Sequence, residues 1–152
     1  MNVNIMLGFI HLFWVGLLAG EEFTIRYGVR SSVASLADQP HIQLRQALIR
    51  RLRILVPAVF ALALLFGIAV TLLFGFDHGF GFRCAGLLAL LTFITVTLTG
   101  TVPINQAALT WDPAAPPQNW ATLLKRWEQL DTARCWAAMA AFALFLAAMA
   151  LQ

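Results

Sequence analysis

The residue types best suited to chemistry stand at two places along the first apolar segment. His11 lies near its middle, and Glu21 and Glu22 lie near its end. His11 and Glu22 are eleven residues apart, so on a helix they point the same way, about 16 Å apart along the axis. An ionisable residue inside a membrane is costly and often functional. His11 is therefore either a proton-transfer or ligand residue or a packing histidine bonded to a threonine or carbonyl. The glutamates are either site residues or interfacial partners of Arg26.

The other candidates lie in residues 100–134, a polar stretch between the last two apolar segments. This stretch holds three of the five tryptophans and four of the six prolines of the chain. The tryptophans here are typical of the aromatic belt at a membrane interface. Any site is expected between this stretch and the inner end of the first apolar segment.

Composition predicts the elements that position these residues. Of 152 residues, 61% are hydrophobic and 11% charged, with a mean hydropathy of +0.79; a soluble domain has about 25% charged residues. Four segments are long enough to cross a bilayer as helices, at residues 3–23, 54–75, 82–102 and 132–151. The sequence therefore predicts one domain over residues 1–152, an all-α bundle of four transmembrane helices in antiparallel, up-and-down order.

The distribution of arginine predicts the orientation. Residues 24–53 carry six arginines against one acidic residue, and residues 103–131 carry one lysine and one arginine. Positively charged loops stay in the cytoplasm, so both termini are expected on the non-cytoplasmic side of a bacterial inner membrane. The first span is expected to be retained, since no positive charge precedes it. The expected partner is the lipid bilayer and not nucleic acid, because a soluble basic module is lacking; no pattern indicates an oligomeric state.

The cysteines predict neither a disulfide nor a metal site. Cys84 is expected at the outer end of the third span and Cys135 near the inner end of the fourth, most of a bilayer apart. A disulfide needs Cα atoms within about 7 Å, so we predict two free thiols. Two cysteines and three scattered histidines also match no zinc-site spacing. We therefore predict no metal ligand.

The basic loop is expected to end in a helix that leads into the second span. Asp38 is a candidate helix start, because Pro40 follows in the first turn. Leucines then recur at helical spacing, at Leu44, Leu48, Leu52 and Leu55. This pattern predicts a basic amphipathic helix on the inner leaflet, with Pro57 bending or resetting its junction with the span.

Two other segments have simpler interpretations. A threonine series in the third span either bonds back to its own helix or forms a polar track towards Asn105; it comprises Thr92, Thr95, Thr97, Thr99 and Thr101. The last helix is expected to begin near Trp120, with Asn119 as its cap. Asp77 and His78 are expected to be surface residues of the short turn between the second and third spans.

The order of residues after the third span resembles a known family. Pro103, Ile104 and Asn105 are expected to close that span, and they are followed by Trp111, Trp120, Arg126, Trp127 and Arg134. This order is similar to that of the anthrone-oxygenase-like family of small four-helix integral membrane proteins, with weaker support from residues 16–22. Members often carry a histidine where this chain has Asp131, so no histidine-based role carries over to that position.

The resemblance implies oxidation of an anthrone or quinol without metal or flavin. Such chemistry needs a base, a dry pocket and donors that hold an oxyanion. The resemblance then implies His11 or Glu22 as the base and Asn105 and Arg134 as donors. Glu22 is favoured, because His11 is expected to lie well above Asn105. The implied substrate-binding set is Trp111, Trp127, Glu21 and Pro103.

Two alternatives to a cofactor-free oxidase stay open. The first is a non-enzymatic accessory or permease-like membrane protein, in which the motif is structural. The second is a haem protein, since His11, Trp14 and Gly16 are similar to the opening helix of haem-binding protoporphyrinogen oxidases of the four-helix membrane type. Those proteins use a second ligand from another helix, and the spans hold no other histidine or lysine.

Overall fold

The computed structural model describes residues 3–151, and all its regular elements are helices. This is expected in lipid, where each segment must satisfy its own backbone hydrogen bonds. In chain order the elements are α1 (Val3–Phe23), the π-helical segment η1 (Thr24–Val29), α2 (Arg30–Ala34), α3 (Asp38–Phe74), α4 (Phe80–Val96), the π-helical segment η2 (Thr97–Thr101), α5 (Val102–Ala108) and α6 (Trp120–Ala150).

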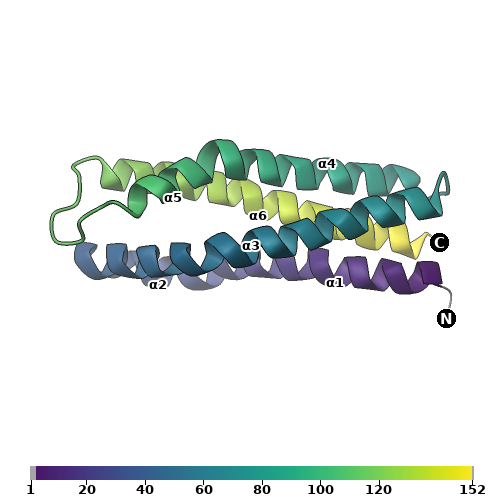
Figure 1. Cartoon of the computed structure of the whole chain (residues 1–152), viewed down its shortest axis with the longest axis horizontal. Coiled ribbons are helices and arrows are strands. Elements are labelled where there is room, and N and C mark those ends of the chain that lie inside the picture. Colours follow the sequence, from purple (N-terminus) through teal and green to yellow (C-terminus); the bar gives the residue numbers. More distant parts are fainter. Residues whose placement is uncertain (1–2, 152) are drawn as a thin grey trace.

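Four long helical rods run side by side, and the chain enters and leaves the bundle at the same end (Figure 1). Contacts join α1 to α3, α3 to α4, α4 to α6, and α6 back to α1. Each rod therefore packs against the rods before and after it in a closed ring. All four are long and apolar enough to cross a membrane. The predicted all-α bundle of four membrane-spanning helices is confirmed.

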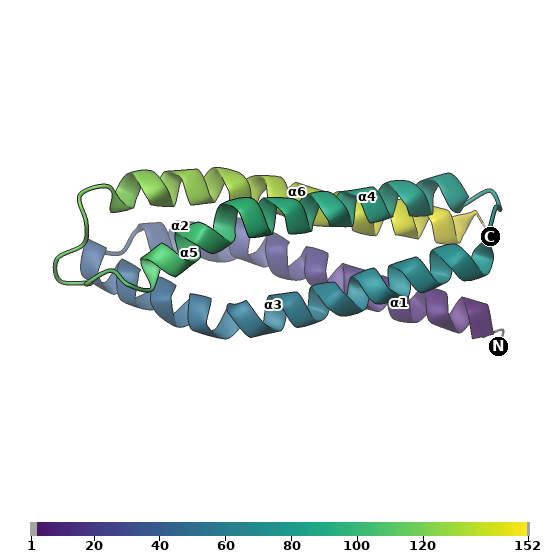
Figure 2. The ribbon, with the colours of Figure 1, turned by 45° about the horizontal axis from the view of Figure 1, so that its top comes forward.

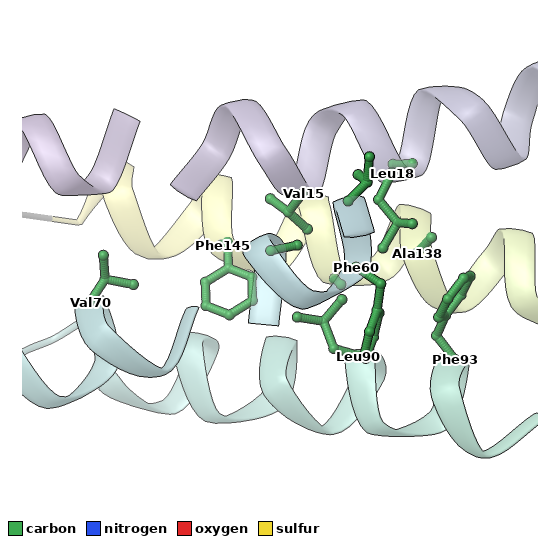
Figure 3. Packing of buried hydrophobic residues seen from close by; sticks show 12 residues of the cluster. Val15, Leu18, Phe60, Val70, Leu90, Phe93, Ala138 and Phe145 are labelled. Carbon is green, nitrogen blue, oxygen red and sulfur yellow. The ribbon is translucent and has the colours of Figure 1, made fainter. Parts of the chain in front are cut away.

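The middle of the bundle is a core of interlocking apolar side chains (Figure 3). Val15 and Leu18 of α1 meet Phe60 of α3, and the rings of Phe60 and Phe93 stack with centroids 5.5 Å apart. The outer face is equally apolar: Leu72, for example, is 75% exposed. A helix that is hydrophobic all round is typical of a membrane span, where lipid covers the outer face.

The first half of α3 begins at Asp38 and leads into the second span, as predicted. The helix runs unbroken through Pro57. Its leucine stripe is divided: Leu44 is 39% and Leu55 56% exposed, whereas Leu48 and Leu52 line a cavity inside the bundle. The buried face carries His41, Ile42, Arg45, Gln46 and Ile49. The leucine spacing does not mark this face, because it mixes polar and apolar residues.

Other local predictions had mixed outcomes. Every threonine of the series donates its hydroxyl to a carbonyl four residues earlier, at 2.7–3.2 Å, so the back-bonding interpretation is confirmed. Both cysteines are free, as predicted. The helix α6 begins at Trp120 with Asn119 at its N-cap position, as predicted, although the Asn119 side chain makes no capping hydrogen bond. Pro103 does not close a helix; it stands in the first turn of α5, which continues the rod of α4.

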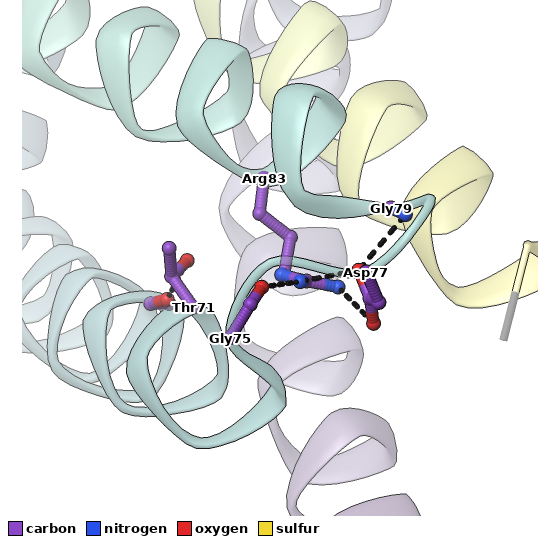
Figure 4. A network of polar contacts seen from close by, with 6 residues as sticks. Thr71, Gly75, Asp77, Gly79 and Arg83 are labelled. Carbon is purple, nitrogen blue, oxygen red and sulfur yellow. Dashed lines mark hydrogen bonds and ion pairs between the residues drawn. The ribbon is translucent and has the colours of Figure 1, made fainter.

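The turn between α3 and α4 is built around a buried arginine (Figure 4). Arg83 is only 1% exposed, and its guanidinium donates to both carboxylate oxygens of Asp77, at 2.6 and 3.2 Å, and to the carbonyl of Gly75 at 2.8 Å. Asp77 also accepts from the backbone N–H of Gly79 at 2.9 Å. Gly75 has φ of +62°, a conformation that side chains disfavour. Asp77 therefore holds the turn together.

Replacing Asp77 with Asn is expected to lower the free energy of unfolding by about 1–3 kcal/mol, because Arg83 loses a charged partner. Hydrogen bonding to Arg83 lowers the pKa of Asp77 below its ordinary value of 3.8. The stabilisation is therefore complete above pH 3.8 and is lost as the pH falls through the lowered pKa. Thermal unfolding in detergent, followed by circular dichroism across pH, measures both effects. Asp112→Asn is the control, and equal losses in both variants would contradict the assignment.

Glycine 86 sets the distance between α4 and α6. A Cβ atom there would lie 2.6 Å from Cε2 of Phe145, closer than atoms pack. We expect Gly86→Ala to lower stability by about 1–3 kcal/mol through overpacking. The matched control is Gly81→Ala in the same helix, where a Cβ meets nothing within 4 Å. That change should be neutral or slightly stabilising, because alanine favours helix. A Gly86→Ala protein as stable as Gly81→Ala would refute the packing argument.

Candidate functional site

A cavity of about 370 Å³ opens inside the half of the bundle away from the chain termini. This half is formed by η1, α2, the start of α3, α5 and the start of α6 (Figure 2). Its apolar walls come from α3 and α4, in particular Leu52, Val56, Phe60, Phe93 and Ile94. The volume lies in the range of about 300–1,000 Å³ that is typical of small-molecule sites.

Two π-helical segments flank the cavity and explain why the bundle opens there. Ile25 and Val29 of η1 and Thr97 and Thr101 of η2 line it. A π-helical turn is wider than an α-turn and often occurs at functional sites. Each π-helical segment therefore changes the direction in which the side chains of its rod point, at the position where the tightly packed core ends. Gly100 lets η2 approach α6, since a Cβ there would lie 2.8 Å from Leu130.

Glu22 and Arg134 form a buried ion pair that joins α1 to α6 beside the cavity. Their side chains are 2% and 9% exposed, and the guanidinium donates from Nη2 to Glu22 Oε1. Nη1 of Arg134 also lies 3.4 Å from the hydroxyl of Thr101. The guanidinium sits over the ring of Phe93, 4.8 Å from its centroid. Arg134 thus has partners on three helical elements, which fixes its position at the cavity wall.

Arg45 of α3 and Asn105 of α5 lie next to each other in the cavity wall. Nη2 of Arg45 lies 3.5 Å from Oδ1 of Asn105, a marginal hydrogen bond. The Arg45 guanidinium also lies over the ring of Trp127, 4.2 Å from the centroid. Next to Arg45, Gln46 donates to the carbonyls of Ala108 and Trp111, both at 2.9 Å. These bonds hold α3 against the end of α5.

Acidic groups complete the polar part of the lining. Glu128 pairs with Arg30 at its edge. Asp131 is 2% exposed, and in the described chain its Oδ2 makes no hydrogen bond. The same holds, within residues 3–151, for one carboxylate oxygen each of Glu21 and Glu22. Buried polar groups normally have partners, so these atoms are available to a ligand or to water.

The structure brings together five of the predicted site residues and separates three. The five that line the cavity are Glu21, Glu22, Asn105, Trp127 and Arg134. Trp111 lies instead in a separate apolar cluster, with its ring 6.5 Å from that of Trp120. Pro103 is exposed and His11 lies deeper in the bundle, so neither lines the cavity. Their predicted roles in one site with Asn105 therefore have no geometric support.

His11 occupies its own small space in the core. It lies on the same buried face of α1 as Glu22, as predicted. Its ring packs edge-on against Phe145, with centroids 4.1 Å apart. The Ala63 carbonyl interacts with the ring, yet neither ring nitrogen makes a regular hydrogen bond within the described chain. The adjoining space is about 10 Å³, room for one water at most.

Sequence reasoning missed Arg45 and left Asp131 without a role. Arg45 was counted as part of the topology signal, although it lies three residues from Ile42 and four from Ile49, on one helical face. That shared face was the available signal. Asp131 stands three residues before Arg134 and points to the same side. Among the described residues, no three His, Cys, Asp or Glu side chains are grouped as metal ligands would be.

Comparison with known proteins finds one family that matches this chain. A family model described as anthrone oxygenase matches residues 45–144, which include Arg45, Asn105, Asp131 and Arg134. No curated protein matches the chain, and no solved structure matches it.

Replacing Arg134 with Met is expected to cost about 3–5 kcal/mol of stability, because it leaves the carboxylate of Glu22 buried and unpaired. The matched control is Arg30→Met. Arg30 and its partner Glu128 are 26% and 23% exposed, so that loss should be about 1 kcal/mol or less. Thermal unfolding in one detergent compares the two variants. Adding Glu22→Met should recover part of the Arg134→Met loss; equal destabilisation by the two arginine variants would contradict the assignment.

Proposed function

The chain belongs to the anthrone oxygenase family, and we propose that this multi-pass membrane protein uses molecular oxygen to oxidise a lipophilic, anthrone-like aromatic. The observation that carries the proposal is the cavity, which joins apolar walls to buried carboxylate and guanidinium groups with unused hydrogen-bonding capacity. A flat aromatic molecule can fill the apolar part while its acidic hydrogen and its oxygen face the polar part.

The proposed reaction converts the CH₂ group of an anthrone into a carbonyl. A base removes one proton, and the resulting carbanion, delocalised onto the ring oxygen, passes electrons to O₂ and forms a C–O bond. Loss of water from the peroxide then gives the quinone. One anthrone and one O₂ yield one quinone and one water, so no other oxidant is required. The protein needs to supply a base, stabilise the anion and exclude bulk water.

Asp131 is the better-placed base. It is buried, it lines the cavity, and it is in none of the ion pairs of the described chain. Glu22, which the sequence favoured, is held by Arg134 through one oxygen. Arg45 and Asn105 are suited to hold an anionic oxygen of the substrate, because guanidinium and amide N–H groups donate to oxyanions. Trp127 supplies an aromatic wall beside Arg45.

Purified protein should consume O₂ and release one quinone per O₂ when it is given an anthrone. We expect Asp131→Asn to lower kcat about 100-fold or more, the usual scale for a general base. Asn105→Ala should lower kcat about 10-fold or more through the loss of an oxyanion donor. Glu22→Gln should have a smaller effect than Asp131→Asn. An oxygen electrode and chromatography of the quinone provide the measurements.

Two controls separate catalysis from background. Heat-inactivated protein measures spontaneous oxidation of the anthrone. Asp112→Asn tests a remote carboxylate, whose side chain accepts a hydrogen bond from the backbone N–H of Ala114 at 2.9 Å. Oxygen uptake no faster than the heat-inactivated control, or full activity in both Asp131→Asn and Asn105→Ala, would refute the proposal.

A further inference from the structure

Arg45 differs from the other buried arginines. Three arginines are buried, namely Arg45, Arg83 and Arg134. Arg83 pairs with Asp77, and Arg134 pairs with Glu22. Within residues 3–151, Arg45 is in no ion pair. A buried charge without a charged partner is costly, so the position of Arg45 needs an explanation.

The existing contacts of Arg45 leave most of its donors free. Its bond to Asn105 is 3.5 Å long, at the limit of a hydrogen bond. Its Nε makes no hydrogen bond in the described chain. The guanidinium carbon of Arg45 lies over the ring of Trp127, 4.2 Å from the centroid, and this contact is with the ring face and not with a hydrogen-bond acceptor. The N–H groups of the edge therefore remain available beside the cavity.

The helix around Arg45 is firmly packed, so the side chain is a built feature of the cavity. Ile42, one turn earlier, is fully buried. Gln46 makes two hydrogen bonds of 2.9 Å to backbone carbonyls at the end of α5. These contacts fix the orientation of α3 and bring Arg45 next to Asn105. A loosely held surface arginine would turn towards solvent instead.

Charge is distributed unevenly around the cavity. All four lining carboxylates come from α1 and α6, namely Glu21, Glu22, Glu128 and Asp131. The lining residues of α3 include Arg45, Arg53 and His41 but no acidic residue. Arg30 and Arg134 already neutralise Glu128 and Glu22. The α3 wall therefore attracts negative charge, and the wall formed by α1 and α6 accepts protons.

We propose that Arg45 and Asn105 form a docking site for an anionic oxygen, so that the cavity takes a flat aromatic acid. The ligand's carboxylate or ionised phenol would accept hydrogen bonds from the edge of Arg45 and from the Asn105 amide, and its rings would lie between the apolar walls. The inference rests on the proposed function, since it specifies the substrate class of the same cavity. A volume of about 370 Å³ suits a drug-sized molecule and not a two-chain phospholipid.

The test compares two probes that differ only in charge, an anthraquinone carboxylate and the corresponding carboxamide. Binding is measured by quenching of tryptophan fluorescence, without turnover, in nanodiscs of neutral phosphatidylcholine. We expect the protein to bind the carboxylate about tenfold more tightly or better, the scale of a charge-assisted hydrogen bond. Arg45→Gln should remove this preference and leave carboxamide binding within about twofold, because the apolar walls are unchanged.

Two further variants test whether the preference for the carboxylate probe depends on Arg45 itself. Arg51→Gln is the matched control, since Arg51 is exposed on the same helix and does not line the cavity; it should keep the full preference. Arg45→Lys keeps the charge but not the flat, forked donor set, so it should keep only part of the preference. This variant also tests the inference if Arg45→Gln does not fold. Circular dichroism checks the folding of each variant.

Several outcomes would overturn the inference. These are equal affinity of the wild type for both probes, binding of neither probe, and an unchanged preference in Arg45→Gln or Arg45→Lys. In nanodiscs that contain phosphatidylglycerol, loss of carboxylate binding would assign Arg45 to a lipid headgroup and equally overturn it. The proposed function is tested separately, because a carboxylate preference without oxygen uptake removes only the oxidase proposal. Oxygen uptake with equal probe affinities removes only the anion site.

Discussion

The ion pair between Glu22 and Arg134 lies where the apolar, membrane-spanning core of the bundle meets its polar site. Charged groups are costly among apolar helices unless they pair. Here the pair joins the first helix to the last, and the Arg134 guanidinium lies over Phe93 at the edge of the apolar core. On one side of this pair the helices interlock through residues such as Phe60 and Leu90. On the other side they enclose the cavity.

The change from core to cavity has a local cause in the backbone. The segment η1 begins two residues after Glu22, and η2 contains Thr101, whose hydroxyl lies next to Arg134. Two wide helical turns therefore meet at the ion pair from different rods. Threonines that bond back to their own helix favour such distortions, and Thr24, Thr97 and Thr101 all do so. The cavity thus depends on two short π-helical segments, and the helical rods that contain them continue beyond it.

The sequence was sufficient for the bundle and for part of the site. Apolar length alone predicts the four spans, because lipid leaves helices as the only solution, and helical periodicity correctly places His11 and Glu22 on one face. Periodicity was a poor guide at α3, where Leu44 and Leu55 face outward and Arg45 shares the buried face with Ile42. In a membrane, apolar residues cover both faces, so a leucine stripe no longer marks the interior. Residue type could not separate Trp127, which lines the cavity, from Trp111, which packs in an apolar cluster.

The two ends of the bundle show why the cavity, and not simply burial, indicates function. At the end near the termini, Arg83 has partners for both terminal nitrogens and a carboxylate that binds nothing but the turn. The hydrogen bonds of these groups all stay within the turn, which gives them a structural explanation, although Nε of Arg83, like that of Arg45, makes no hydrogen bond within residues 3–151. At the other end Asp131, Glu21 and Arg45 are covered from solvent while they keep unused donors or acceptors. Apolar side chains of similar size would serve stability as well or better there. Groups that are costly to bury and unnecessary for folding are best explained by a ligand that uses them.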